Sequence, residues 1–318
     1  MDGMLMNTLT TGPNAARSDT AADHATARVI ALCPDHANAD AAHTCRNTAT
    51  IAENECQVRS NAWVNAEYKH LVLTAPDLAL TARAGQFFHL ACPASNDDTP
   101  YLRRPMSIYC VAAEDSRIEF LYKVQGAGTR GLAQLQPGDT LDALGPLGNG
   151  FALPVSAEPA HVLLLGRGVG LATMAPLAQQ AIAARAHVTA ILSARSEALM
   201  MSADYLRAAG ADVITVTDSE QTSDVVQVES LIRKIHAQRR ITFVSTCGSN
   251  RLLVMLQRVA AQLSIAGQVA LEQRMGCGYG ACYACVRPFR KEAGSQELSY
   301  RRVCWEGPVF DLQETTSW

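Results

Sequence analysis

The sequence lacks a long apolar run, an excess of positive charge and an apolar segment behind a basic start. Its apolar runs, such as residues 161–165, fall short of the roughly 20 residues that cross a bilayer. The formal net charge is −3 and no Lys/Arg-rich run occurs, which argues against nucleic-acid and membrane-surface partners. The missing apolar segment predicts no secretory signal. We therefore expect a cytoplasmic protein that binds neither nucleic acid nor membrane.

Ten cysteines are the unusual feature of the composition. A disulfide framework is typical of short secreted chains. This chain has 318 residues and is 48% hydrophobic, enough for two ordinary domains and a small third one. Four cysteines crowd into residues 277–304, and the other six are scattered. This distribution favours a metal centre in a reducing cytoplasm.

The first 54 residues differ in composition from the rest. They are rich in Ala, Thr, Asp, Asn and His, so they bury too little apolar surface to offset chain entropy. We expect residues 1–54 to form a disordered or low-complexity extension. Irregular spacing argues against a metal site at His24, Cys33, His36, His43 and Cys45.

The remaining sequence predicts a multidomain β plus α/β protein. Residues 55–155 contain short alternating runs separated by turn residues, which indicate an antiparallel β-barrel. Residues 156–266 alternate apolar runs with Ala/Leu-rich helical segments, as in a doubly wound nucleotide-binding domain. Residues 267–318 hold the cysteine cluster and predict a small domain organised by its metal.

The cysteine spacing points to one type of cluster. Cys277, Cys282 and Cys285 are followed by Cys304 after 18 intervening residues, and C-x4-C-x2-C…C is the plant-type [2Fe–2S] spacing. Glycines at 276, 278 and 280 let backbone N–H groups approach the sulfurs. A structural zinc site is the alternative, but zinc ligands usually come as two C-x2–4-C pairs.

Two segments of the predicted barrel suit a flavin. Arg104-Pro-Met-Ser107 lies directly before a predicted strand, where an arginine and a hydroxyl can pair with a pyrophosphate and a flavin ring edge. Leu121-Tyr-Lys123 runs into a glycine turn ending in Gly128-Thr129, whose N–H groups can hold phosphate. Each alone is more often a solvated edge or a hairpin, and their joint occurrence carries the prediction.

The predicted α/β domain contains a glycine turn. Gly166, Gly168 and Gly170 follow an apolar run and open a helix, the setting of a dinucleotide-binding turn, although the G-x-G-x-x-G spacing is incomplete. A purely structural turn is the alternative. Arg195 and Ser196 end the next strand and leave the choice between NAD and NADP open. Cys247 is either a small buried side chain or a neighbour of the nicotinamide.

These motifs together resemble the ferredoxin-reductase superfamily, and within it the electron transfer subunits of NAD-dependent dihydroorotate dehydrogenases. The resemblance spans about residues 56–314. Its most specific stretches are 104–107, 126–129, 276–285 and 303–310. Arg167, a long insert before Cys304 and the first 54 residues depart from the family pattern.

The resemblance implies a role for each matching residue. FAD is expected at Arg104, Pro105, Met106, Ser107, Leu121, Tyr122 and Lys123, with its pyrophosphate at Gly128 and Thr129. The NAD(P)H nucleotide is expected at Gly166, Gly168 and Gly170, with Cys247 and Gly248 near its reactive ring. The [2Fe–2S] ligands are expected to be Cys277, Cys282, Cys285 and Cys304.

The resemblance also implies an electron-transfer flavoprotein of pyrimidine biosynthesis. Such a chain shuttles electrons between NAD(P)H, FAD and the cluster, to or from a catalytic partner in a hetero-oligomer. The expected partner is an FMN-containing dihydroorotate dehydrogenase, because this sequence shows no FMN-binding (β/α)8 barrel of its own. The alternatives are a reductase component for an oxygenase or another redox partner, and a non-catalytic redox sensor.

Overall fold

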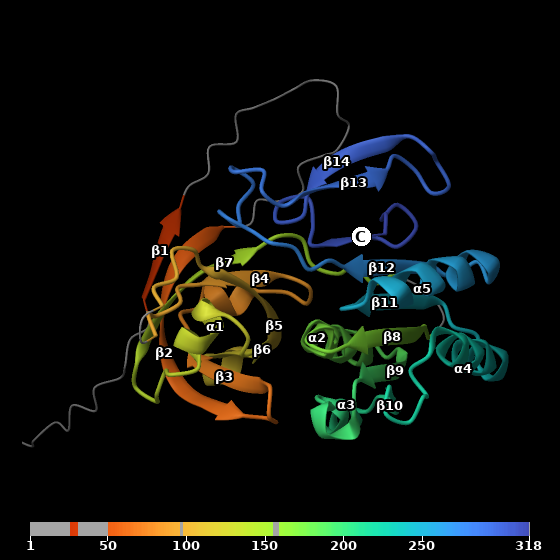
Figure 1. The fold of residues 1–318 in the computed structure, drawn as a ribbon, viewed down its shortest axis with the longest axis horizontal. Helices are drawn as coiled ribbons and strands as arrows, with labels where there is room; N and C mark the ends of the chain where they lie inside the picture. The colour runs from red at the N-terminus through yellow and green to blue at the C-terminus, as the bar shows by residue number, and fades with distance from the viewer. Residues whose placement is uncertain (1–25, 31–49, 96–97, 155–158, 318) are drawn as a thin grey trace, which may run out of the picture.

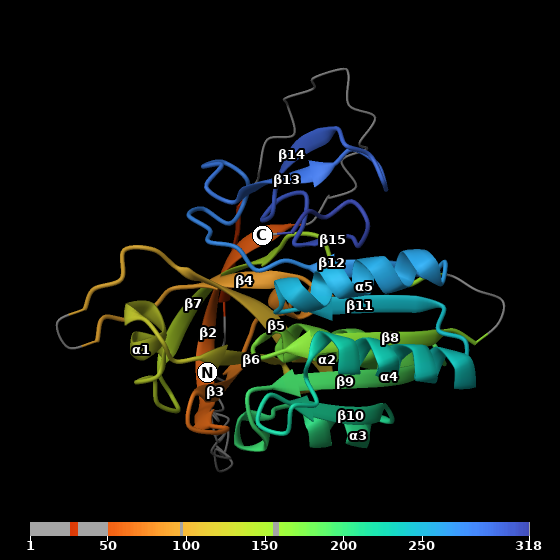
Figure 2. The same cartoon turned by 45° about the vertical axis from the view of Figure 1, so that its right-hand side comes forward.

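The computed structural model describes residues 26–30, 50–95, 98–154 and 159–317. It contains a closed antiparallel barrel, a six-stranded α/β sheet and a cysteine-rich segment. The barrel lies beside the α/β layers, and the cysteine-rich segment, at the blue end of the chain, lies against both (Figures 1 and 2). The histidines and cysteines considered for an N-terminal metal site lie outside the described residues.

Six strands close the barrel in the order β2-β3-β6-β5-β4-β7, because β7 pairs back onto β2. They are β2 (Ile51–Trp63), β3 (Tyr68–Thr74), β4 (Phe87–Leu90), β5 (Arg104–Ala112), β6 (Arg117–Lys123) and β7 (Thr140–Leu147). Helix α1 (Ala127–Leu132) and 3-10 turns at Ala79–Thr81 and Ala113–Asp115 connect them. Buried and half-buried side chains alternate along β3, as one core-facing side of a pleated strand requires. The predicted antiparallel barrel is confirmed.

A disordered or low-complexity extension was expected over residues 1–54, and this expectation is wrong for two stretches that the structure describes, residues 26–30 and 51–54. Strand β1 (Thr26–Ile30) pairs antiparallel with residues 51–55 of β2. Residues 51–54, also placed in the extension, open the first barrel strand. Small and polar residues surround both stretches, so the composition of this region did not reveal the strands. Their pairing depends on backbone hydrogen bonds and not on side-chain type.

The α/β domain has a sheet in the order β10-β9-β8-β11-β12-β15. Its chain order is β8 (His161–Arg167), α2 (Gly170–Ala183), β9 (His187–Ala194), a 3-10 turn (Glu197–Leu199), α3 (Ala203–Ala209), β10 (Asp212–Thr217), α4 (Val225–Gln238), β11 (Phe243–Cys247), α5 (Asn250–Gln262) and β12 (Ala266–Ala270). Helices α2 and α3 pack on one face and α4 and α5 on the other (Figure 2). The doubly wound prediction is confirmed. In the described ranges, no helix combines the length and apolar character that crossing a bilayer demands.

The cysteine-rich segment is joined to this sheet. After the hairpin of β13 (Val286–Arg290) and β14 (Leu298–Arg302), strand β15 (Val309–Asp311) pairs antiparallel with β12. The sheet therefore runs past the boundary expected at residue 266 and takes its last strand from the cysteine-rich end. The side-chain amide of Gln257 on α5 adds hydrogen bonds to the carbonyls of Leu312 (2.6 Å) and Thr315 (2.7 Å).

Removing the Gln257 amide tests this attachment. Gln257→Ala removes the side-chain donor of the Leu312 carbonyl and one of the two donors of the Thr315 carbonyl, which keeps Arg290 at 2.8 Å. It should therefore lower the free energy of unfolding by about 1–3 kcal/mol, measured by denaturant titration of the cofactor-loaded chain. The matched control is Gln180→Ala, whose side chain is exposed on α2 and should change stability by less than about 0.5 kcal/mol. Equal effects of the two substitutions would show that the contact adds no stability.

Candidate functional site

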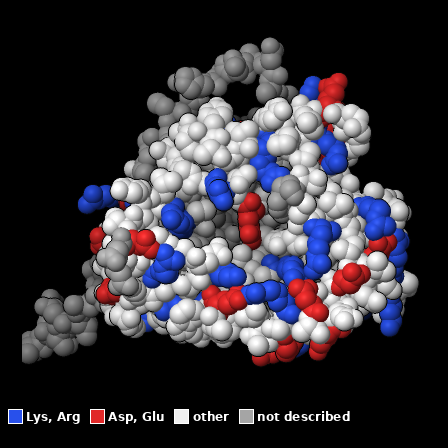
Figure 3. Space-filling view, viewed as in Figure 1, with Lys and Arg blue, Asp and Glu red and all other residues white. Residues whose placement is uncertain are grey.

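A pocket of about 710 Å³ opens between the barrel and the α/β domain, a size in the usual range for small-molecule sites. Strands β5 and β6 form the barrel wall, and the start of α2 with residues 271–275 forms the opposite wall. Figure 3 shows Lys and Arg side chains gathered around a hollow in the middle of this face, with acidic side chains among them. Such a field suits an anionic ligand.

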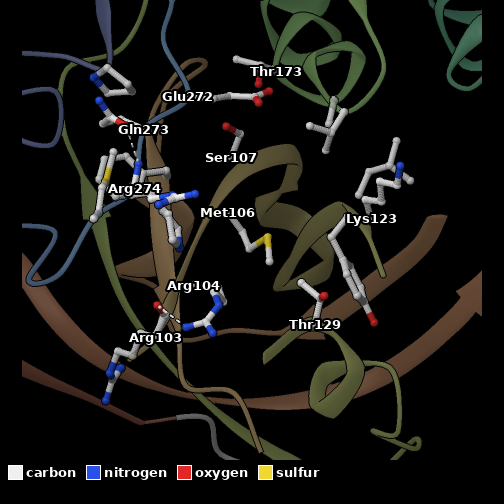
Figure 4. A pocket seen from close by; sticks show the side chains of 18 of the residues that line it. Arg103, Arg104, Met106, Ser107, Lys123, Thr129, Thr173, Glu272, Gln273 and Arg274 are labelled. Atoms are coloured by element: carbon white, nitrogen blue, oxygen red, sulfur yellow. Dashed lines mark hydrogen bonds between the residues drawn. The ribbon is translucent and has the colours of Figure 1, made fainter. Parts of the chain in front are cut away.

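The predicted flavin residues gather at this pocket. Its lining includes Arg104, Pro105, Met106, Ser107, Leu121, Tyr122, Lys123 and Thr129. Gly128 lies behind Arg104, where an added Cβ would come within 2.8 Å of the Arg104 Nε. The segment 104–107 was expected just before a strand and instead forms the first residues of β5. In the view of Figure 4, Ser107 lies on the side of Glu272 and Thr173, and Arg104 and Thr129 lie on the other.

Positive charge in the barrel wall comes mainly from Arg104. Its guanidinium donates to backbone carbonyls of Leu102 and Arg103, and no carboxylate pairs with it in the described part of the chain. Lys123 is held by Glu67 at 2.9 Å. The Thr129 hydroxyl accepts N–H groups of the preceding turn at 2.9 and 3.0 Å, so it shapes the start of α1. An uncompensated arginine in a wide pocket fits a pyrophosphate-bearing cofactor.

Glu272 is a site residue that the motifs did not reveal. It lies just beyond the carboxyl end of β12, and its side chain lines the pocket. Protein atoms packed around the Glu272 carboxyl raise the pKa of that carboxyl. The Cys247 thiol donates to Glu272 Oε1 at 3.8 Å. Burial, and then the Glu272 charge, raise the pKa of Cys247 well above its usual value. A carboxylic acid beside a thiol, at the C-terminal ends of parallel strands, is a candidate site. Prediction of β12 from the sequence would have placed Glu272 at this edge of the sheet.

The predicted nucleotide residues meet at that same edge. They are Gly166, Gly168, Gly170, Cys247 and Gly248. A Cβ on Gly170 would lie 2.5 Å from the Cys247 carbonyl oxygen, and one on Gly248 would lie 2.1 Å from the Arg167 carbonyl oxygen. Glycine at these two positions therefore lets the two turns touch, which is a packing role. Cys247 is 3% exposed, as expected of a small buried side chain.

The Arg167 side chain forms hydrogen bonds with residues at the ends of the neighbouring strands. It donates to the Ser193 hydroxyl at 2.7 Å and to Asp218 Oδ2 at 2.6 Å. Arg251 approaches the other Asp218 oxygen at 3.4 Å. The Arg167 hydrogen bond is the main cause that lowers the pKa of Asp218 to about 2. Arg195, one of the two residues considered for the choice between NAD and NADP, pairs with Glu67 of the barrel.

The four predicted cluster cysteines form two pairs. The N–H groups of Cys277 and Cys282 each point to the other's sulfur at 3.4 Å, and the Cys304 N–H points to the Cys285 sulfur at 3.4 Å. Val286 of β13 lies opposite Arg302 of β14, so the hairpin formed by the long insert returns Cys304 to Cys285.

The two pairs fit a two-iron cluster. A [2Fe–2S] unit takes two cysteines on each iron, and no three His, Cys, Asp or Glu side chains in the described ranges converge as a single metal ion requires. N–H donors, led by that of Ala284, hold the pKa of Cys282 below its usual value. The hydrogen bond between the Cys285 and Cys304 thiols lowers the pKa of Cys285 and raises that of Cys304. Thiolates, the form that binds metal, are therefore favoured at Cys282 and Cys285.

The pairs differ in burial. Cys285 and Cys304 are buried and pack in the same apolar cluster as Phe87, which also lines the pocket. Cys277 is half-buried and Cys282 is exposed. One side of the cysteine site therefore faces the pocket region and the other faces solvent.

Arg302 is a second residue that the motifs missed. It donates to the Gly280 carbonyl at 3.0 Å, lies over the Tyr283 ring at 5.1 Å and pairs with Glu306 at 2.6 Å. These contacts hold the loop between Cys277 and Cys285. Gly280 has φ +87°, and a Cβ there would strike the Trp305 ring at 3.1 Å, so the loop requires glycine at this point.

The fold and site together define a ferredoxin-reductase-like flavoprotein with an iron–sulfur segment. Among solved structures, the NADH-dependent reduced ferredoxin-NADP oxidoreductase studied for flavin-based electron bifurcation has a TM-score of 0.66 at 22% identity, covering 81% of this chain and 88% of that one. Ferredoxin-NADP⁺ reductase from Plasmodium falciparum has a TM-score of 0.52 at 15% identity, covering 66% and 90%. At these identities the likeness concerns the fold alone.

Sequence relatives identify the family. Residues 272–316 match the family described as the iron–sulfur cluster binding domain of dihydroorotate dehydrogenase B. The dihydroorotate dehydrogenase B (NAD⁺) electron transfer subunit of Desulforamulus reducens is 34% identical over 76% of this chain and 89% of its own length. That of Geobacillus kaustophilus is 34% identical over 83% and 98%. The chain belongs to the family of dihydroorotate dehydrogenase B electron transfer subunits, as its motifs predicted.

Proposed function

We propose that this chain is an oxidoreductase subunit that carries electrons between a nicotinamide nucleotide, FAD and a [2Fe–2S] cluster. Membership of the electron transfer subunit family supports this function. The observation that carries it is the continuity between the sites: Phe87 lines the pocket and packs in one cluster with Cys285 and Cys304. A reducing cytoplasm suits the thiolate ligands, and we place the chain there.

Each part of the chain has a task in this proposal. When bound, FAD exchanges a hydride with the nicotinamide nucleotide and single electrons with the cluster. Arg104 binds the pyrophosphate, while Ser107 and residues 121–123 orient the flavin ring between the two pocket walls. The turns at residues 166–170 and 247–248 receive the nucleotide opposite Glu272. The four cysteines hold the cluster beyond Phe87.

A catalytic partner completes the reaction. The described strands form an antiparallel barrel and a doubly wound sheet, and no (β/α)8 barrel for FMN lies among them, so dihydroorotate is oxidised on another subunit of a hetero-oligomer. The exposed Cys282 side of the cluster is the exit toward that partner. We assign FAD to the barrel, expected over 55–155, the nucleotide to 156–266 and the cluster to 267–318. The barrel also includes residues 51–54 of β2, and the nucleotide domain also includes β12 at 266–270.

Loss of one outer ligand separates the two halves of the electron path. Cys282→Ser should abolish the cluster EPR signal and electron transfer to the catalytic subunit. It should leave reduction of bound FAD by NADH within about twofold, because the serine lies beyond the flavin on the path. Cys110→Ala, a cysteine of β5 outside the cluster, is the control and should keep both activities. Loss of NADH-dependent flavin reduction in Cys282→Ser, with FAD still bound, would contradict this order of carriers.

We also propose that the nucleotide is NAD(H). Arg167 joins Asp218 to Ser193 at the end of β9, the part of a doubly wound domain that receives the ribose. A 2′-phosphate brings about 1.5 to 2 negative charges and would be repelled there by Asp218, which already pairs with Arg167 and Arg251. Asp218→Asn should therefore raise kcat/KM for NADPH relative to NADH by about tenfold, which is about 1.4 kcal/mol. The control is Asp204→Asn on α3, whose carboxylate pairs only with Arg207 among the described residues. An unchanged ratio in Asp218→Asn would refute this account of nucleotide preference.

A further inference from the structure

Strand β4 carries two kinds of side chain on its two faces. Phe88 and Leu90 point into the barrel core, so the alternate residues Phe87 and His89 point out of the barrel. Phe87 reaches the apolar cluster that contains Cys285 and Cys304. The His89 ring lies against Gly278 in the loop between the first two cluster cysteines. The two outward-facing residues of β4 therefore both lie on the side of the cysteine site.

His89 is buried and has an unused polar atom. His89 is 1% exposed, and its Nε2 atom has no hydrogen-bond partner among the described residues. Burial, and to a lesser extent the charge of Arg103, lower the pKa of His89 to about 4. The imidazole can donate a hydrogen bond from Nε2 both as the neutral Nε2–H tautomer and as the imidazolium. A buried donor without an acceptor is unfavourable and calls for a partner.

The position of the ring indicates what that partner is. A Cβ built on Gly278 would lie 2.9 Å from both Nε2 and Cδ2 of His89, so the imidazole lies directly on the loop backbone. Gly278 has φ +83° and follows the ligand Cys277. The group that this loop is built to enclose is rich in sulfur acceptors, and hydrogen bonds to such sulfurs are a main control of cluster potential.

We propose that the His89 side chain donates a hydrogen bond from Nε2 to a sulfur of the [2Fe–2S] site and thereby raises its reduction potential. This inference rests on the proposed function, because it needs a bound cluster. The reduced cluster carries one more negative charge than the oxidised one, so a fixed donor stabilises the reduced form more. By raising the potential, His89 makes the cluster a better acceptor of electrons from the flavin side.

A pair of substitutions at His89 tests the donor directly. His89→Leu keeps an apolar volume and removes the N–H, whereas His89→Gln places an amide N–H near the Nε2 position. In redox titrations of the full, cofactor-loaded chain followed by EPR, His89→Leu should lower the ratio of reduced to oxidised cluster at a given potential about tenfold, or about 59 mV. His89→Gln should recover most of this loss.

The control is His187→Leu, at the start of β9, where the histidine pairs with Asp212 at 3.0 Å. It should leave the cluster potential unchanged. If His89→Leu and His89→Gln both titrate like the wild-type chain, the proposal is wrong. It is also wrong if both shift equally, since the shift then follows loss of the ring and not loss of the donor.

Two further measurements keep the outcome decisive. Iron and acid-labile sulfide are counted in every preparation, and a wild-type chain without two of each would overturn the proposed function and not His89 alone. If His89→Leu fails to hold a cluster, pulsed EPR of the reduced wild-type chain labelled with ¹⁵N-histidine decides. A ¹⁵N coupling that disappears in His89→Gln supports the hydrogen bond, and absence of any coupling in the wild-type chain refutes it.

Discussion

A three-way junction at residues 307–311 holds the three parts of this molecule together. The Gly307 carbonyl accepts the N–H of Asn149 after the last barrel strand, and the Pro308 carbonyl accepts the N–H of Leu271 after β12 at 2.9 Å. Strand β15 then pairs with β12. Because these residues come directly after Cys304, they fix the buried side of the cysteine site against both the barrel and the nucleotide sheet. The proposed order of carriers depends on this junction.

Burial gives the cysteine site a direction. Cys285 and Cys304 lie in the apolar interior with Phe87, whereas Cys282 reaches the surface. In the proposed function, the buried pair would hold the iron nearer the pocket and the outer pair would hold the iron nearer solvent. Low exposure on one side and access on the other are what a carrier between a flavin and a partner subunit requires.

Local patterns predicted much of this arrangement. The C-x4-C-x2-C spacing is a local property, and so are the alternation of the barrel strands and the apolar run of β8. Strands β1, β12 and β15 were missed because each is short and is defined by its partner in the sheet. Glu272 was missed with β12, since the carboxyl edge that exposes it was not foreseen.

Side-chain partnerships were the other limit of the sequence. Arg167 reads as a departure in a glycine turn, but its role depends on Asp218, which lies 51 positions further along the chain. Thr129 was expected to contact phosphate, and in the structure its hydroxyl caps the turn that precedes α1. His89 belongs to a four-residue strand without a motif, and only the folded chain places it on the loop of Cys277.

The central claim is the order in which the carriers are reduced. Rapid mixing of the cofactor-loaded chain with NADH under anaerobic conditions, with samples frozen at increasing times, follows flavin absorption and the cluster EPR signal together. This account predicts that the flavin bleaches first and that the cluster signal grows afterwards. Cluster reduction ahead of the flavin, or cluster reduction by NADH in a chain stripped of FAD, would contradict it.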